Sequence, residues 1–407
     1  MRSKGEVKRH VDRLVVAVVA AVVAGSGALA SAQTVRLRTV EPDAGRGRAA
    51  AVVVEQGALV HTAIFHPLDA DGRLQGGRDA DAQAAFVLGR VEAALRAGGS
   101  SLDRIARLHV YVADASVTAS VDRLLAERFT GDAKPAVTIV ESAMPHAGVL
   151  VAMDAVGATP RSAARGERLV VPGIPPAPGN GAHVAVQPEG PFVIVSGRAA
   201  PGEFEAAVRA TMEQLRGDLK AVDLAFEHAV HVKAFLSDMT RAADLRRIVA
   251  GTFDGTAPPI VVTEWRGASL PVEIELVATA PGAAGGDERL VLVEPIMARY
   301  SRIARVFAGR PVFVSAVGGT SADPAAQARE MFDALRRVLT AAGSDMRHIA
   351  KVTYYVSDKA ADQEINTIRP SIYDPARPPA ASKISVQGVG TPGRVTVTDA
   401  IAVTTGR

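Results

Sequence analysis

The stretch "DMRHIAKVTYYVSD" (345–358) decides the fold, because the chain contains two further versions of it. These are "SLDRIARLHVYVAD" (101–114) and "DLAFEHAVHVKAFLSD" (223–238), so the unit recurs about every 120 residues. Each version alternates in side-chain character like a half-buried β-strand and closes on an aspartate. Three copies at one period predict three tandem domains of one fold.

The repeated strand has two unlike faces. Alternate residues from Val352 to Val356 are apolar or aromatic, whereas those from Lys351 to Tyr355 are polar or aromatic. We expect the first face to pack on helices and the second to form a sheet-to-sheet contact with a polar interior. Amphipathic segments precede the three strands, at Ala82–Ala97, Phe204–Ala221 and Ala325–Ala342.

The rest of the unit can be read around this strand. A hairpin strand comes before the helix, as in "GPFVIVSGRA" (190–199), and a second helix follows the aspartate, as in "ADLRRIVAGTF" (243–253). A proline-led strand and a last strand, "LPVEIELVATA" (270–280), close the unit. The predicted fold class is therefore α+β, with the order β-β-α-β-α-β-β, in domains at 33–157, 166–281 and 288–404.

Residues 1–32 are typical of a secretory signal peptide. A basic start that includes Arg2 and Arg13 is followed by the apolar run Leu14–Ala24 and by "ALASAQ", with small residues Ala30 and Ala32 before Gln33. We expect cleavage after Ala32 and a secreted or periplasmic protein. The alternative is an uncleaved membrane anchor, against which the short, Gly-interrupted apolar run argues.

Composition excludes several classes of function. The chain has no cysteine, which removes disulfides, thiolate metal sites and a cysteine nucleophile. Of 46 basic and 43 acidic side chains, residues 1–32 hold five and two, which leaves 41 of each sign in the remainder. A neutral body with few aromatics gives no electrostatic basis for nucleic-acid binding, and no later segment is long and apolar enough to span a membrane.

Several short motifs resemble the RidA family, also called YjgF or endoribonuclease L-PSP. They are "VSG" (195–197), "RYS" (299–301), "AAGS" (341–344), "YDPARPP" (373–379) and "VEIE" (272–275). The resemblance covers almost all of the chain after residue 32, three times over, and is weakest in the first copy.

The resemblance implies a chorismate-mutase-like α+β fold that usually forms homotrimers with ligand clefts between subunits. Three fused copies then imply a single-chain pseudo-trimer, which we expect to be a monomer with three inter-domain clefts. The best-known activity of the family is hydrolysis of 2-imino acids without a cofactor. An arginine in a "PAR" motif holds the substrate carboxylate, and the glutamate that closes "VEIE" helps to activate water.

The arginine of that motif is replaced in all three copies. "KPAVTIV" (134–140) places Val137 there, "APPIVVTEW" (257–265) places Ile260, and "PPAASKISV" (378–386) places Ala381. Cations nearby are Lys134, Arg266, Lys383 and Arg394. A strand residue one position away points to the opposite face, so a neighbour does not automatically take the role.

A carboxylate is retained at the other position. Glu275 corresponds to Asp154 in the first copy and to Asp399 in the third, whereas Glu273 is matched only by Ala152 and Val397. Asp154, Glu275 and Asp399 are therefore the candidate catalytic residues, as general bases, or else structural acceptors of backbone N–H groups. Glu273 is expected to be a solvated residue. A catalytic acid in a cleft should have a raised pKa.

The candidate ligand-binding residues come from the hairpin strands, the tyrosine motif and the displaced cations: Thr62, Ser196, Ser315, Tyr300, Arg266 and Lys383. The pairs His61/His66 and His228/His231 lack a third ligand at a supporting spacing, so we predict no metal site. Two functions stay open. One is binding of a small molecule without imine hydrolysis, and the other is hydrolytic deamination of imines or enamines that lack a carboxylate.

Overall fold

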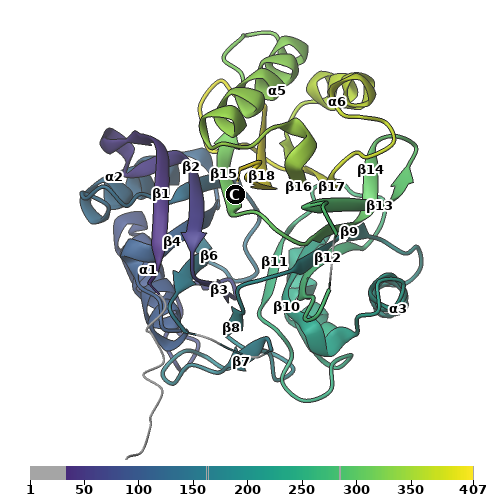
Figure 1. Cartoon of the computed structure of the whole chain (residues 1–407). Coiled ribbons are helices and arrows are strands. Elements are labelled where there is room, and N and C mark those ends of the chain that lie inside the picture. The colour runs from purple at the N-terminus through teal and green to yellow at the C-terminus, as the bar shows by residue number, and fades with distance from the viewer. Residues whose placement is uncertain (1–33, 162, 164, 284–285, 407) are drawn as a thin grey trace, which may run out of the picture. The chain divides into compact units, whose positions relative to one another are not determined.

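Each repeat consists of strands that face the inside of the molecule and two helices that cover them (Figure 1). The computed structural model describes residues 34–161, 163, 165–283 and 286–406. The predicted signal peptide, residues 1–32, lies outside the described residues. The described residues form one compact unit.

The three repeats share one order of elements. Repeat 1 contains β1 (Arg36–Asp43), β2 (Arg48–Gln56), β3 (Ala58–Thr62), α1 (Ala80–Ala97), β4 (Ile105–Val112), α2 (Thr118–Arg128), β5 (Ala136–Glu141) and β6 (Val151–Thr159). Repeat 2 contains β7 (Glu167–Leu169), β8 (Val184–Gln187), β9 (Phe192–Arg198), α3 (Phe204–Lys220), β10 (Ala229–Leu236), α4 (Ala242–Ala250), β11 (Ile260–Glu264) and β12 (Val272–Thr279). Repeat 3 contains β13 (Leu290–Ile296), β14 (Tyr300–Val306), β15 (Pro311–Val317), α5 (Pro324–Ala341), β16 (Ile349–Val356), α6 (Lys359–Ile372), β17 (Ala380–Ser385) and β18 (Thr396–Val403). The predicted order is present in every repeat, with one further strand at its start.

The repeated strand lies at the centre of each sheet. β4 pairs parallel with β5 and antiparallel with β6, and β10 and β16 pair in the same way with their own neighbours. A parallel pair needs a crossover connection, which α2, α4 and α6 supply. The closing aspartates cap the segments that lead into these helices. Asp114 accepts the Ser116 N–H at 2.9 Å, and Asp358 accepts the Ala360 N–H at 2.7 Å.

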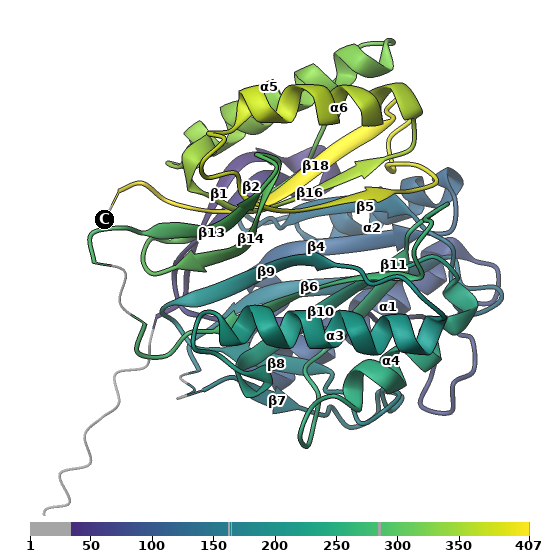
Figure 2. The ribbon, with the colours of Figure 1, turned by 90° about the vertical axis from the view of Figure 1, so that its right-hand side faces the viewer.

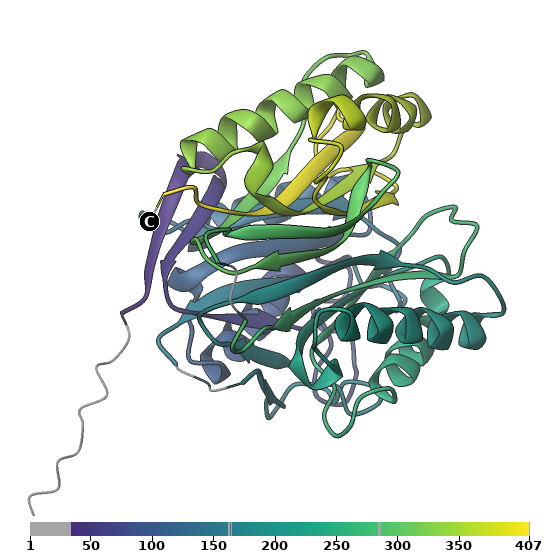
Figure 3. The same ribbon diagram turned by 45° about the vertical axis from the view of Figure 1, so that its right-hand side comes forward.

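Strand pairing also joins the repeats to one another. β3 pairs with β8, β9 with β14, and β15 with β2, all antiparallel. Figure 3 shows β14 beside β9 where repeat 3 meets repeat 2. The three sheets are thereby closed into a ring, and the three-domain pseudo-trimer expected from the sequence is what the chain forms.

Three separate apolar cores lie between the sheets and their helices. In repeat 3 the core contains Val352, Tyr354 and Val356 of β16 together with Met331 and Leu335 of α5. Repeats 1 and 2 have equivalent cores. Figure 2 shows α3 and α4 on one side of the strands and α5 and α6 on the other. The predicted assignment of the helix-facing side of the repeated strand is confirmed.

The opposite faces of the three central strands meet in the interior. His109, Lys233 and Thr353 are each less than 5% exposed, although two of them are ionisable. The polar interior predicted from the alternation is therefore present, and it brings the candidate acids together.

Among the described residues no helix is both long and apolar enough to cross a membrane.

Candidate functional site

Strand register places three equivalent acid-bearing pairs in the interior. They are His109 opposite Asp154, Lys233 opposite Glu275, and Thr353 opposite Asp399. Because each side chain points to the same face of its sheet as its partner, all six converge where the three repeats meet. We call this set, with its bonded neighbours, the central network.

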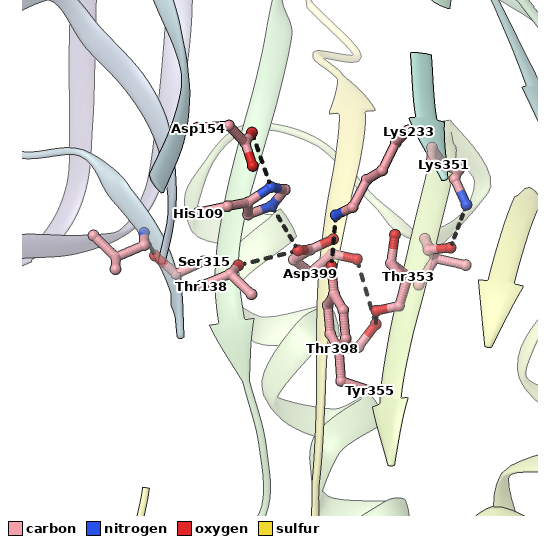
Figure 4. Close-up of polar contacts among 12 residues, drawn as sticks. His109, Thr138, Asp154, Lys233, Ser315, Lys351, Thr353, Tyr355, Thr398 and Asp399 are labelled. Carbon is pink, nitrogen blue, oxygen red and sulfur yellow. Dashed lines mark hydrogen bonds and ion pairs between the residues drawn. The ribbon is translucent and has the colours of Figure 1, made fainter. Parts of the chain in front are cut away.

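His109 lies between two of the acids (Figure 4). Its Nε2 is 3.0 Å from Oδ2 of Asp399, and its Nδ1 is 3.4 Å from Oδ1 of Asp154. The Tyr111 hydroxyl donates to Asp154 at 2.8 Å, and the Thr138 hydroxyl donates to Asp399 at 3.1 Å. Asp399 of repeat 3 is therefore held by two side chains of repeat 1.

The third acid is held by the next repeat in the same manner. Ser382 of repeat 3 donates to Oε2 of Glu275 at 2.6 Å, and Nζ of Lys351 lies 2.8 Å from the same oxygen. Lys233 donates to the Tyr355 hydroxyl at 3.0 Å, as Figure 4 shows. Glu275 and Asp399 thus join neighbouring repeats through charge-assisted hydrogen bonds, whereas Asp154 is held within repeat 1 by Tyr111 and His109.

The central network keeps its carboxylates ionised. Burial acts to raise the pKa of Asp154 and of Asp399, but His109, Lys233 and Arg107 outweigh it and lower both pKa values well below the usual range. Burial also acts to raise the pKa of Glu275, but Lys351 and Lys233 outweigh it, so that the pKa is lowered overall. Acids with lowered pKa values are weak general bases, so this environment suits a structural charge cluster better than proton transfer.

A small cavity of about 30 Å³ lies inside the central network, next to Arg107, Lys351 and Glu275. Its volume suffices for one or two water molecules. Two of the larger cavities lie between repeats and away from the three acids.

The first cavity has a volume of about 260 Å³ and lies between repeats 1 and 2. Its lining is mostly apolar and includes Ile64, Phe65, Leu68, Ile174, Met239 and Ile260. Two buried donors in the lining, Nη2 of Arg246 and Nε2 of His66, have no hydrogen-bond partner within the described part of the chain. Burial lowers the pKa of Arg246 to about 10, so this side chain remains charged at neutral pH.

The second cavity has a volume of about 330 Å³ and lies between repeats 1 and 3. It contains Ser315 and Val317 of β15, Val137 of β5, and four arginines. The arginines are Arg46, Arg48, Arg337 and Arg394. The two large cavities therefore differ in chemistry, one apolar and one cationic.

Comparison with known proteins decides the family. The model of the family described as endoribonuclease L-PSP matches the chain three times, at residues 43–159, 177–280 and 293–403. The chain belongs to the endoribonuclease L-PSP family.

Individual relatives match single L-PSP repeats. Protein DfrA of Myxococcus xanthus is 31% identical over 114 residues, which are 26% of this chain and 84% of the relative. A Rid-family protein of unknown function from Yersinia pestis is 24% identical in sequence, with a TM-score of 0.28, and the match covers 30% of this chain and 98% of that one. A YjgF-family protein from Mycobacterium tuberculosis is 26% identical in sequence, with a TM-score of 0.22, and the match covers 24% of this chain and 82% of that one.

The position of the L-PSP-family arginine can be followed by strand register. Three residues occupy equivalent places opposite the central strand: Val137 opposite Leu108, Ile260 opposite Val232, and Ala381 opposite Val352. Ile260 lines the first cavity and Val137 the second. Strand register therefore shows that Val137, Ile260 and Ala381 occupy equivalent positions in the three repeats.

The hydroxyls of the hairpin strands bind backbone groups. Ser196 accepts the N–H of Ala381 at 3.0 Å, and Ser315 accepts the N–H of Val137 at 2.7 Å. Each serine thus fixes the strand of the next repeat at the position of the family arginine. Thr62 instead accepts the N–H of Ala155, within its own repeat, at 2.9 Å.

Of the six candidate ligand-binding residues, Ser315 lines the second cavity and the others line neither of the two cavities. Arg266 is exposed and its backbone N–H bonds to Ser385, while the ammonium of Lys383 contacts Asp362 of α6. Tyr300 packs at the edge of the apolar core of repeat 3. The geometry does not bring Arg266, Lys383 or Tyr300 to either of these two cavities, so their role in ligand binding stays a prediction. Of the four cations considered, Arg394 is the one that reaches a large cavity.

Glu273 is a second correction, because it was expected to be solvated. Its Oε1 is buried and has no hydrogen-bond partner among the described residues. A Cβ atom on Gly197 would lie 2.0 Å from that oxygen, so the glycine of "VSG" permits the approach of the glutamate. Burial raises the pKa of Glu273 to about 7, against smaller lowering effects of Ser382 and Lys351.

Arg246 is the residue that sequence reasoning missed. It lies four residues after Ala242 and three before Val249, so it is on the buried face of α4 in spite of its charge. An arginine on the apolar stripe of a short amphipathic helix was the available signal. For Arg46 and Arg48, in the turn between β1 and β2, no sequence signal separates them from ordinary surface arginines.

Proposed function

We propose that this L-PSP-family protein is a small-molecule-binding protein whose first cavity holds a mainly apolar molecule with one anionic group. The supporting observation is the pairing of an apolar cavity of about 260 Å³ with the unpartnered buried guanidinium of Arg246. Pockets that combine an apolar lining with few polar groups are the usual form of a ligand site.

Charge in the first cavity favours an anion. The lining contains Arg90 and Arg246 and no aspartate or glutamate. Burial lowers the pKa of His66 well below its usual value, and the charges of Arg246 and His146 add to this effect. His66 is therefore neutral at pH 7 and can act as a hydrogen-bond donor or acceptor beside Arg246.

The same cavity lacks the means for imine hydrolysis. Ile260 occupies the position where the resemblance places the family arginine, and none of the retained acids Asp154, Glu275 and Asp399 lines this cavity. The lining has no carboxylate, and burial lowers the pKa values of its histidines His66, His146 and His183, which makes them weak general bases for activating water. These features support a first cavity that binds a ligand and does not hydrolyse standard 2-imino acids.

Titration with 4-phenylbutyrate tests the proposal, with the uncharged alcohol 4-phenylbutanol as the comparison ligand. We expect the acid to bind and Arg246→Ala to weaken it by about 10- to 100-fold, because a charge-assisted hydrogen bond is lost. Arg247→Ala is the matched control, since Arg247 is the next residue of α4 but is exposed and contacts Asp244. Equal affinity of wild type and Arg246→Ala, or no binding of the acid, would contradict the proposal.

Hydrolytic deamination of an imine or enamine is the second candidate function. The observation in its favour is Glu273, because a carboxyl group with a pKa of about 7 is suited to general acid–base catalysis at neutral pH. Glu273, rather than Glu275, would then be the reacting acid, since Glu275 is held by Lys351 and Ser382.

We further propose that the chain after residue 32 is secreted and works as a monomer. The three pairings between repeats close the ring of sheets, so the surfaces that form a homotrimer elsewhere are already used. Light scattering should give a mass of about 40 kDa, against 42.2 kDa for the whole chain. A stable trimer of full chains would refute the proposal of a monomer.

N-terminal sequencing of the exported protein checks the expected cleavage after Ala32.

A further inference from the structure

The second cavity gathers positive charge in a protein body that is otherwise neutral. Its lining holds four arginines, against two carboxylates, which are those of Glu41 and Asp43. Arg337 forms an ion pair with Glu41, and the Asp43 carboxylate accepts the backbone N–H of Arg46. An excess of two positive charges remains around an open volume of about 330 Å³.

Three of these arginines, Arg46, Arg48 and Arg394, have few or no contacts with carboxylates in the described part of the chain. Among the described residues, the side chains of Arg46 and Arg394 make no hydrogen bond or ion pair, and Arg48 has one contact, 3.6 Å from Asp122. Burial lowers the pKa of Arg394, and the nearby charge of Arg46 adds to it. Burial lowers the pKa of Arg48 as well; Asp122 and Asp43 oppose this effect, and Arg46 and Arg394 add to it. The three guanidinium groups therefore lie close enough to repel one another.

The arginines come from two repeats. Arg46 and Arg48 lie at the turn between β1 and β2, and Arg394 precedes β18. β2 pairs with β15, and this pairing fixes the turn against repeat 3. Mutual repulsion at a junction between repeats needs an opposing charge, which an anionic ligand supplies.

We propose that the second cavity binds the phosphate group of a small phosphate monoester through Arg46, Arg48 and Arg394. This rests on the proposed function of the cavities between repeats as small-molecule sites and adds a second ligand class to it. A phosphate monoester carries close to two negative charges on one group, which matches three guanidinium groups that line one cavity and the net charge of that lining. The cavity is larger than a phosphate ion, which leaves room for the esterified body beside Ala316 and Val389.

The experiment is calorimetric titration at constant ionic strength with phenyl phosphate, inorganic phosphate and succinate. We expect phenyl phosphate to bind more tightly than inorganic phosphate, and succinate to bind at least tenfold more weakly than phenyl phosphate because its charges are separated. Arg46→Ala and Arg394→Ala should each weaken phenyl phosphate at least tenfold. Arg46 is exposed, so its removal leaves the fold intact. Arg266→Ala, also exposed and outside both cavities, is the control.

The outcomes separate this inference from the proposed function. Phenyl phosphate binding that persists in both Arg46→Ala and Arg394→Ala, or that Arg246→Ala alone removes, overturns the inference and assigns the anion to the first cavity. Succinate binding as tight as phenyl phosphate overturns the choice of phosphate. No phenyl phosphate binding, together with Arg246-dependent binding of 4-phenylbutyrate, overturns the inference and leaves the function of the first cavity standing.

Discussion

Asp399→Ala should lower the free energy of unfolding by about 3–5 kcal/mol, because it removes one partner from a buried charge cluster. Asp399 is 4% exposed and accepts from His109 and Thr138. Without it, Lys233 and Arg107 lose one of the carboxylates that offset their burial. Urea unfolding at pH 7 measures the loss.

Asp333→Ala is the control for this expectation. Asp333 pairs with Arg336 on the surface of α5, with its side chain 75% exposed, so its removal should change stability by less than about 1 kcal/mol. If Asp399→Ala unfolds at the same urea concentration as Asp333→Ala, the central network does not hold the repeats together. Folded Asp399→Ala should still bind 4-phenylbutyrate like wild type, since Asp399 is not part of the first cavity.

The sequence was sufficient for the fold because the repeat carried redundant information. The alternation from Lys351 to Val356 assigned both faces of the central strand, and two further copies confirmed the register. Alignment of the copies also identified the equivalence of Asp154, Glu275 and Asp399, which the pairing of β6, β12 and β18 reproduces. Local patterns of this kind are set within one repeat, so the chain displays them directly.

The candidate site was harder to predict because it depends on contacts between repeats. Nothing local to "VEIE" indicates that Ser382 and Lys351, more than 70 residues away, hold Glu275 and leave an oxygen of Glu273 without a partner. Arg246 is separated by about 180 residues from His66, which lines the same cavity. Retention of an acid in all three copies indicated a shared role, and the geometry assigns that role to the charge cluster between repeats.

Glu273 and Glu275 should give opposite results when each is changed to glutamine. Burial raises the pKa of Glu273 to about 7 from an ordinary value of 4.5, so the folded protein binds its proton more tightly than the unfolded chain does. Its contribution to stability is complete below pH 4.5 and is lost as pH rises to 7 and above. Glu273→Gln cannot ionise and should therefore be more stable than wild type at pH 8, by on the order of 3 kcal/mol. At pH 5 the gain should fall to about 1 kcal/mol or less.

The pKa of Glu275 is shifted the other way, because Lys351 and Lys233 lower it in spite of burial. Its contribution is present above the ordinary pKa of 4.5 and is lost as pH falls below it, so Glu275→Gln should destabilise the protein at pH 8. Urea unfolding of both variants at pH 5 and pH 8 provides the comparison. A Glu273→Gln variant that is less stable than wild type at pH 8 would show that Glu273 is ionised and paired in the folded protein. The other outcome is that Glu273→Gln is stabilised and no longer releases ammonia from an uncharged imine. This result would identify Glu273 as the reacting acid of the deaminase alternative, because catalytic groups are often held in environments that lower stability.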